Sequence, residues 1–491
     1  MSLTKVTNSM IVGAYVNVLD YGTNTVPGTT NMAPAINAAI VAAGEGGTVF
    51  FPKGIYNTTS PILAEDLSGL TLLGEHATSD DAGTAIIGTH TGKCILSLVG
   101  SRGVVVSGLA LYGATTTYPK TGLLLGRSSG ASAGNHVFYN LGVKGSFSVA
   151  AVYNVASEDV CFFQCIIFPT LAPIAAASFS QTDYASIGGL TGSSMETVQF
   201  YGGYLANSDT TAGSTCLYLP LGNATGHHLY NNVFFAKNGG SSYIKLAVGA
   251  SDGTSSIFPI QFNNPACEPG PTSPTTCFEI VAGQGGLSLG GLTINNLWAN
   301  SGTGYTNLFT CDTSFNTTLS GANISLPNNV PGAVSIGNIK GSKFSTLGLS
   351  TAMITTAQGC DLLGSINLTN NLGGNTLRNA SVGLFQLLGP ANTYTKAVIT
   401  SSTYSQNVTD STLIFNGASS NCTVTLLAPS PMVHVILNLV NYSGTYSVVS
   451  ATANVTPLAG GSPTTSILPA GAGKWCTLQS DGFNWLIIQS N

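Results

Sequence analysis

Carboxyl groups are scarce in this chain, so each one in its central part is a candidate for chemistry. Only 7% of the 491 residues are charged. Glu158 and Asp159 directly precede one apolar strand segment, and Glu196 precedes the equivalent segment of the next repeat. Glycoside hydrolysis uses two carboxyl groups about 5 to 10 Å apart, one as an acid and one as a base or nucleophile. We therefore predict a catalytic cluster formed by Glu158, Asp159 and Glu196.

A plainer interpretation of these residues stays open, because acidic residues before strands also cap turns. In the catalytic interpretation, like charges this close raise the pKa of one carboxyl group, as an acid catalyst needs. The second-choice carboxylates, from the same body of repeats or across a subunit boundary, are Asp183, Asp209 and Glu279.

A lyase would need a base for the C5 proton of a uronate and cations that stabilise the enolate. His228, Tyr230, Lys237 and Lys245 lie close together in the sequence, but few other cations occur in the central part of the chain. A polyanionic substrate favours a more basic groove. Hydrolysis is therefore our prediction, and a lyase is the alternative.

Aromatic and polar side chains recur on successive predicted strands, and stacked columns of them would suit an extended sugar polymer. The predicted substrate-binding residues are His136, Tyr201, Tyr204, His228, Tyr230 and Trp298. Since neighbours along a strand point to opposite faces, the alternative is aromatic stacking inside the core or at a subunit contact.

These residues must be positioned by a repeat of two strand segments that recurs along the chain. Residues 215–239 show it: an apolar strand, a polar turn, a second strand and a glycine stop. Uneven spacing around a constant strand pair predicts a solenoid with loops of variable length rather than a propeller. Each coil can bury its apolar side only against its neighbours, so we predict a right-handed parallel β-helix. One small or amide residue recurs in the aligned second strands, with the last step spanning two repeats: Gly74, Ser107, Asn140, Gln164, Gly202, Asn231 and Asn295.

The composition excludes several classes of protein. The net charge is −5 and no basic stripe occurs, so nucleic acid is not an expected partner. No apolar run approaches transmembrane length, and the first residues lack the continuous apolar stretch of a secretory signal. The Cys and His residues have no zinc spacing, and the carboxylates cluster too weakly for calcium. We therefore expect no membrane insertion, no metal and no cofactor.

A helix is predicted from Met32 to Ala43, where Ala and Ile recur at helical spacing before Gly44. It would cap the open end of the solenoid, which otherwise exposes an apolar cross-section. The chain is predicted to end in an antiparallel β domain with a hairpin around Asp481 and Gly482. The four predicted parts are a cap at 1–62, a β-helix body at 63–330, a neck or irregular coils at 331–389, and the C-terminal β domain at 390–491.

Three segments near the N-terminus, NVLDYG, AINAAI and GGTVFFPKGIY, resemble the opening of pectate-lyase-like β-helix proteins of bacteriophage tails. The preceding LTKVTNSMI is similar to the short N-terminal segment of phage tailspikes, and WCTLQSDGFNW resembles C-terminal modules of tail fibres and spikes. The resemblance covers residues 4–62 closely and the body only in pattern. The stretch NTVPGTTNMAP departs from it, because it lacks the acidic residues that are common there, so we expect no ion-binding role for that stretch.

The resemblance implies a tailspike that binds and depolymerises a bacterial surface polysaccharide: a capsule, an exopolysaccharide or an O-antigen. It implies a homotrimer that joins the phage tail or baseplate through its N-terminal segment, is assembled in the bacterial cytoplasm, and acts from the virion at the host surface. The alternatives on the same fold are a lyase and a non-enzymatic receptor-binding or structural virion protein. C-terminal modules of this kind commonly trimerise or bind sugar, but for Trp475 and Trp485, which flank the turn, we favour a place in the core of the domain.

Overall fold

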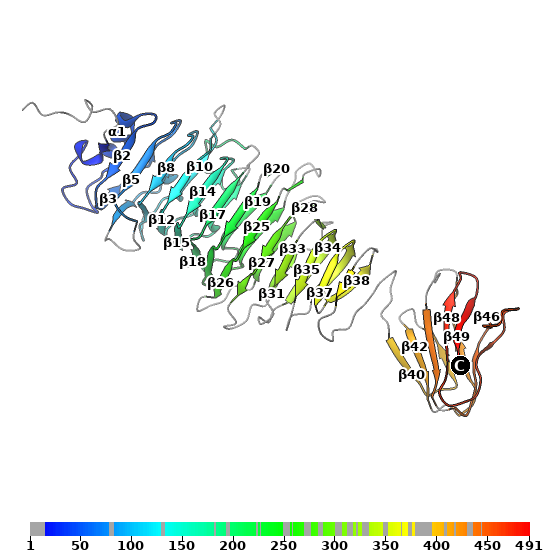
Figure 1. Cartoon of the computed structure of the whole chain (residues 1–491). Helices are drawn as coiled ribbons and strands as arrows, with labels where there is room; N and C mark the ends of the chain where they lie inside the picture. Colours follow the sequence, from blue (N-terminus) through cyan, green and yellow to red (C-terminus); the bar gives the residue numbers. More distant parts are fainter. Residues whose placement is uncertain are drawn as a thin grey trace, which may run out of the picture. The chain divides into compact units, whose positions relative to one another are not determined.

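The computed structural model has two compact units, Met1–Ile366 with Asn375–Val382 and Asn367–Gly374 with Gly383–Asn491 (Figure 1). Each unit is described by itself. The structure describes residues 15–77, 83–128, 133–180, 183–192, 197–221, 224–225, 227–248, 256–257, 259–269, 276–282, 288–299, 307–311, 318–320, 323–326, 333–346, 352–364, 366–371, 376–378, 395–406, 410–416, 419–429, 436–442 and 444–491.

In the first unit the chain winds repeatedly through three sheets of parallel strands. Each strand of one coil pairs with its counterpart in the next coil. Among the described residues the sheets contain 14, 16 and nine strands. This arrangement is a parallel β-helix, which confirms the predicted fold class. Two successive coils consist of β13 (Ala150–Val155), β14 (Val160–Phe163) and β15 (Ile166–Leu171), then β16 (Ala175–Ser180), β17 (Val198–Tyr201) and β18 (Tyr204–Asn207).

Each predicted second strand is in fact two strands, because the chain turns a corner in its middle. The corner residues have a positive φ, which glycine and asparagine adopt at low cost. The register places Gly108, Asn232 and Asn296 at the corner, one residue after the predicted Ser107, Asn231 and Asn295. The repeat expected between these two is present at Asn264. The corner residues are Gly108, Asn140, Gln164, Gly202, Asn232, Asn264 and Asn296.

The asparagine side chains at the last three corners, and those one residue before them, form hydrogen bonds between neighbouring coils. Asn263 Nδ2 donates to Asn231 Oδ1 (2.8 Å), and Asn295 Nδ2 donates to Asn263 Oδ1 (2.9 Å). A parallel ladder joins the corner residues themselves, from Asn296 to Asn264 and from Asn264 to Asn232. These bonds satisfy amides that would otherwise lose hydrogen bonds at the corner, and they fix the relative position of neighbouring coils.

The nine-stranded sheet positions the site described below. Along each of its strands, residues on the outer face alternate with residues that face the core, as the exposed–buried pattern of β15 shows. Its strands are β3 (Gly54–Thr58), β6 (Thr84–Gly88), β9 (Ala110–Gly113), β12 (Gly142–Ser146), β15, β18, β22 (Phe234–Lys237), β26 (Ala266–Pro269) and β30 (Trp298–Ala299).

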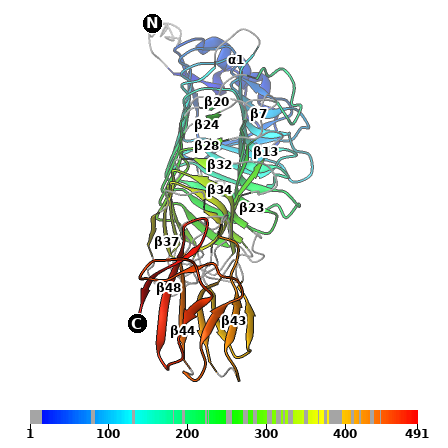
Figure 2. The ribbon, with the colours of Figure 1, turned by 90° about the vertical axis from the view of Figure 1, so that its right-hand side faces the viewer.

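Among the described residues the nine-stranded sheet has no strand after β30, while the other two sheets continue. Several coils also contain a short extra strand at one edge of the sixteen-stranded sheet, and Figure 2 shows these strands one below another. The long β34 (Ala333–Lys340) joins both rows, because its first part pairs with β31 (Asn307–Cys311) and its last part with the last of the extra strands. The extra strands are β20 (Ala224–Thr225), β24 (Ser256–Ile257), β28 (Ser288–Gly290) and β32 (Thr318–Ser320).

The predicted cap helix is present as α1 (Ala33–Ala43). Ile36 and Ile40 are buried, and the helix packs against the first strands of the β-helix. Gly44 ends it with a positive φ of 62°, and its N–H donates to the Ile40 carbonyl (3.0 Å). Among the described residues no helix has the length and apolar character needed to cross a bilayer.

The second unit contains the predicted antiparallel strands within two mixed sheets. β44 (Ile436–Asn441) pairs antiparallel with β48 (Lys474–Ser480), which pairs antiparallel with β49 (Trp485–Ser490) across the Asp481–Gly482 turn. Earlier strands of both sheets pair in parallel, as β40 (Thr395–Ile399) does with β42 (Asp410–Phe415). Trp485 is buried and its Nε1 donates to the Leu427 carbonyl (3.0 Å), whereas Trp475 is 37% exposed.

Candidate functional site

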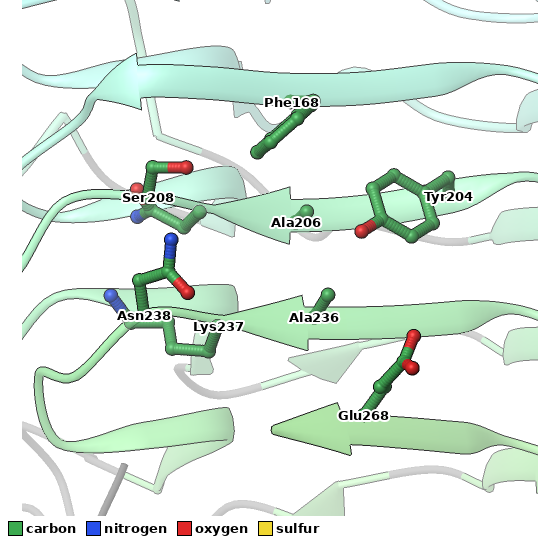
Figure 3. Close-up of a pocket in the computed structure, with 9 residues that line it drawn as sticks. Phe168, Tyr204, Ala206, Ser208, Ala236, Lys237, Asn238 and Glu268 are labelled. Atoms are coloured by element: carbon green, nitrogen blue, oxygen red, sulfur yellow. The ribbon is translucent and has the colours of Figure 1, made fainter. Parts of the chain in front are cut away.

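A hollow of about 150 Å³ lies on the outer face of the nine-stranded sheet (Figure 3). The register explains its shape. Ala206 pairs with Ala236, and Ala236 pairs with Glu268, so two small side chains form a low floor. Phe168 lies at one end of this row and Glu268 at the other. The hollow is lined by Phe168, Tyr204, Ala206, Asn207, Ser208, Ala236, Lys237, Asn238 and Glu268.

One side of the hollow is aromatic. The ring of Tyr204 stacks on Phe234 with centroids 5.1 Å apart, and it meets Phe168 edge to face at 5.7 Å. Burial is the main cause that raises the pKa of the Tyr204 hydroxyl, with smaller contributions from the neighbouring Cys216 and Glu268. Tyr204 therefore stays protonated at neutral pH and presents a ring face and a hydroxyl donor, two groups that suit a sugar.

The other side is polar and rigid. The buried ammonium of Lys237 donates to the Asp209 carbonyl and to Ser214 Oγ (2.9 Å). Burial lowers the pKa of Lys237, partly opposed by Cys216 and Asp209. Asn207 Nδ2 donates to the carbonyls of Ala172 (3.0 Å) and Thr215 (2.8 Å). These bonds fix the wall from behind.

Glu268 is the one carboxylate among the residues that line the hollow. It is exposed, and the described part of the chain offers it no ion pair and no hydrogen bond. A carboxylate without a protein partner beside an aromatic wall can bind a sugar hydroxyl or exchange a proton with one. No three His, Cys, Asp or Glu side chains of the described residues come together as a metal site would require.

The carboxylates predicted from the sequence lie elsewhere on the coils. Glu158 forms an ion pair with Arg127 (3.6 Å), and Asp159 follows it at the coil edge with a positive φ of 48°. Val160 pairs with Val198, in agreement with the alignment on which the cluster was predicted. Glu196 lies outside the described residues. The predicted cluster therefore stays a prediction, and its described members do not border the hollow.

The second-choice carboxylates are bound up in local structure. Asp183 accepts hydrogen bonds from the N–H groups of Ile187 (2.9 Å) and Gly188 (2.7 Å) and from the Tyr153 hydroxyl (3.2 Å). Asp209 is buried and accepts from two backbone N–H groups, those of Ala172 and Thr211.

The last of them, Glu279, lies on β27 (Thr276–Ala282) of the sixteen-stranded sheet. It pairs with Lys245 (3.5 Å) and accepts from Ser242 Oγ (2.9 Å). Each of the three thus completes a turn, a wall or an ion pair.

Three predicted substrate-binding residues are corrected by the structure, because their side chains point into the core. His136, His228 and Tyr230 are at most 1% exposed. Tyr230 stacks between Phe200 (5.5 Å) and Phe262 (4.8 Å). Burial lowers the pKa of His136 to about 4 and, together with the neighbouring His227, that of His228 to about 3. Tyr230 thus fits the alternative of aromatic stacking inside the core. The sequence pattern did not decide which face these side chains occupy, because the alignment was off by one residue at Asn231 but correct at Asn140, four residues after His136.

The other three predicted residues lie on outer faces. Tyr201, half-buried on the fourteen-stranded sheet, stacks on Phe163 (5.0 Å) and donates to Gln199 Oε1 (2.7 Å). Tyr204 and Trp298 share the outer face of the nine-stranded sheet.

Sequence reasoning missed Phe168, Ser208, Asn238 and Glu268, and it named Lys237 only as a cation for the lyase alternative. The signal for the first four was the corner residue, because outward positions follow it by two, four and six residues. Counting four from Gln164 gives Phe168, and counting four from Asn264 gives Glu268.

The N-terminal part matches a known family. Residues 15–98 match the family model described as rhamnogalacturonase A/epimerase, pectate lyase-like. No curated protein matches the sequence at the significance level applied. The match falls on the cap and first coils, where the sequence resembles pectate-lyase-like β-helix proteins, and it confirms that resemblance.

Solved structures with a similar fold include two phage tailspikes and one enzyme. The Acinetobacter phage vb_AbaP_AS12 gp42 tailspike is 12% identical, with a TM-score of 0.42 over 94% of this chain and 77% of that one. The Dettilon tailspike protein gp208 is 10% identical, with a TM-score of 0.42 over 87% and 72%. The Yersinia enterocolitica family 28 exopolygalacturonase is 11% identical, with a TM-score of 0.42 over 75% and 77%. At these values each likeness is one of fold.

Proposed function

We propose that this chain is a phage tailspike that binds a bacterial surface polysaccharide on its nine-stranded sheet and depolymerises it by glycoside hydrolysis. The observation that carries the proposal is the hollow between the Phe168–Tyr204 aromatic wall and the free carboxylate of Glu268. Carbohydrate sites combine flat apolar faces with a few fixed polar groups. Ser208 and Asn238, which also line the hollow, can supply such polar groups, and the buried Lys237 and Asn207 hold that side of the hollow in place.

In the proposed reaction the Glu268 carboxyl group either donates its proton to the glycosidic oxygen as the bond from that oxygen to the sugar breaks, or, as a carboxylate, takes a proton from the attacking water. Hydrolysis needs a second carboxyl group. Among the described residues no carboxyl group other than that of Glu268 lines the hollow. The second carboxyl group would then come from a neighbouring subunit of the homotrimer that the resemblance implies. The cluster of Glu158, Asp159 and Glu196 is the competing location for the chemistry.

The test uses the full chain and a panel of purified capsules, exopolysaccharides and O-antigens. Binding is measured by co-elution in size-exclusion chromatography, and cleavage by shortening of the polymer together with new reducing ends. We expect one polymer to be bound and shortened. Glu268→Gln should bind without shortening it, and Glu45→Gln, at an exposed residue beyond the cap helix, should behave as the parent chain.

Other results of this test would indicate a different function. Binding of a polymer without shortening by the parent chain would support a receptor-binding protein without enzyme activity. Shortening with the ultraviolet absorbance of an unsaturated uronate would identify a lyase. Failure to bind any polymer of the panel, with the fold intact, would count against a polysaccharide ligand on this face.

A further inference from the structure

The outer face of the nine-stranded sheet extends beyond the hollow, and one tryptophan lies on that extension. The register connects one column of side chains from coil to coil: Ile166 pairs with Tyr204, Tyr204 with Phe234, Phe234 with Ala266, and Ala266 with Trp298. Trp298 is 51% exposed. It is thus an open aromatic surface in line with the aromatic wall of the hollow.

The small side chain of Ala266 separates the two aromatic parts of this column. Phe234 and Trp298 are two rungs apart, which is about 10 Å at the spacing of parallel strands. Glu268 lies on the same strand as Ala266, two residues further along. The carboxylate is therefore on the rung between the Tyr204–Phe234 stack and Trp298, beside the gap that Ala266 leaves.

We infer that Trp298 is a distal binding platform, so that the ligand is an extended, linear run of sugars lying along the axis of the β-helix across several coils. This inference rests on the proposed function. A pyranose unit advances a polymer by roughly one rung, so a polymer along the axis meets a new set of side chains with each sugar. From Phe168 on β15 to Trp298 on β30 the track covers four rungs, about 19 Å. A single sugar fills the hollow but does not reach Trp298.

Two predictions separate this geometry from binding in the hollow alone. Affinity should rise with fragment length until the fragment spans the track, and it should then level off. Long fragments should bind more tightly than short ones, and Trp298→Ala should remove this gain, which is roughly tenfold in affinity for one aromatic platform. The affinity of short fragments should be unaffected. Trp298→Tyr should restore part of the loss, because a ring face remains.

The experiment uses the full chain carrying Glu268→Gln, so that fragments are not cleaved. The probe is a size-fractionated set of oligosaccharides prepared by partial acid hydrolysis of the polymer bound in the panel. Tryptophan fluorescence gives a second readout, since the chain has three tryptophans and the other two, Trp475 and Trp485, lie in the second unit. Long fragments should change the fluorescence of the parent and of the Trp475→Phe control, and not that of Trp298→Phe.

The outcomes test the Trp298 platform separately from polysaccharide binding in the hollow. Length-dependent affinity that Trp298→Ala abolishes, with an unchanged melting temperature, supports the distal platform. Equal affinity of parent and Trp298→Ala for every fragment length overturns it while leaving polysaccharide binding in the hollow intact. If the parent chain binds no fragment and no polymer, the proposed function itself fails.

Discussion

Two regions of the same coils carry polar and aromatic residues, and they use them in opposite ways. At the coil edge before the fourteen-stranded sheet, Glu158 is paired with Arg127, and His136 is buried without contact to solvent. In the hollow, the described residues offer no hydrogen-bond partner to the Tyr204 hydroxyl and no ion pair to the Glu268 carboxylate. The edge resembles an active site in sequence, but its Glu158 is held in an ion pair and its His136 is closed off from solvent, which leaves Asp159 as the half-buried carboxylate there. The hollow is where the described chain leaves such groups available.

The largest expected effect of this difference is on turnover. Glu268→Gln should reduce the rate of polymer cleavage by about 10²–10⁴-fold, the usual contribution of a general acid or base, while binding persists because the amide retains the shape. Rates of reducing-end formation measure it, with Glu45→Gln as the control. If Glu158→Gln or Glu196→Gln removes activity and Glu268→Gln does not, the sequence-based cluster is the catalytic one.

The buried histidines should make stability depend on pH. The folded-state pKa values of about 4 for His136 and about 3 for His228 lie below the ordinary value of 6.5. As the pH falls from 6.5 to 4 the unfolded chain takes up protons that the folded chain refuses. The free energy of unfolding therefore falls, by up to about 1.4 kcal/mol per pH unit for each histidine.

Denaturant unfolding at pH 7, 5.5 and 4 measures this effect. His228→Phe retains a ring beside Tyr230 and removes one titrating group, so its stability should fall less steeply over the same window than that of the parent. Parallel pH profiles for the two proteins would show that His228 is not buried as described. The rate of polymer cleavage is the second readout, and at pH 7 it should be similar for the parent chain and His228→Phe.

A smaller effect is expected at the aromatic wall. Tyr204→Ala removes a ring that stacks on Phe234 and faces the hollow, so binding of the polymer should weaken by roughly tenfold. Tyr204→Phe removes the hydroxyl and keeps the ring, so the loss of affinity should be smaller. Isothermal titration with the bound polymer measures both. Tyr201→Ala, on a different sheet, is the matched control, and equal losses for both positions would refute a specific role of the hollow.

The smallest effect is expected at the coil edge. The Glu158–Arg127 pair is partly exposed, and such pairs contribute about 0–1 kcal/mol. Glu158→Gln should therefore lower the free energy of unfolding by no more than about 1 kcal/mol and change turnover by less than about twofold. Thermal unfolding and the cleavage assay check both numbers. A large loss of turnover at unchanged stability would transfer the proposed chemistry from the hollow to the edge.

Several features of this protein were determined by the sequence alone. The recurring apolar segments and uneven repeat predicted the parallel β-helix, because a coil of this kind is stable only when stacked. Ala and Ile at helical spacing before Gly44 predicted α1. The predicted column of small and amide residues fell on the corner at Asn140, Gln164 and Gly202, and one residue before it at Ser107, Asn231 and Asn295. The hairpin around Asp481 and Gly482 followed from its turn residues.

Only the tertiary structure decided which side chains share a face. The alignment placed Asn231 at a corner that Asn232 occupies, and with a side-chain period of two an error of one residue exchanges inside and outside. The predicted binding residues were therefore not assigned to a face by the sequence, and His136, His228 and Tyr230 lie in the core. Glu268 was overlooked because its neighbours in the hollow, Ala236 and Tyr204, are 32 and 64 positions away in the sequence. Hydrogen bonding between coils brings them together, and loops of unequal length conceal that register from the linear sequence.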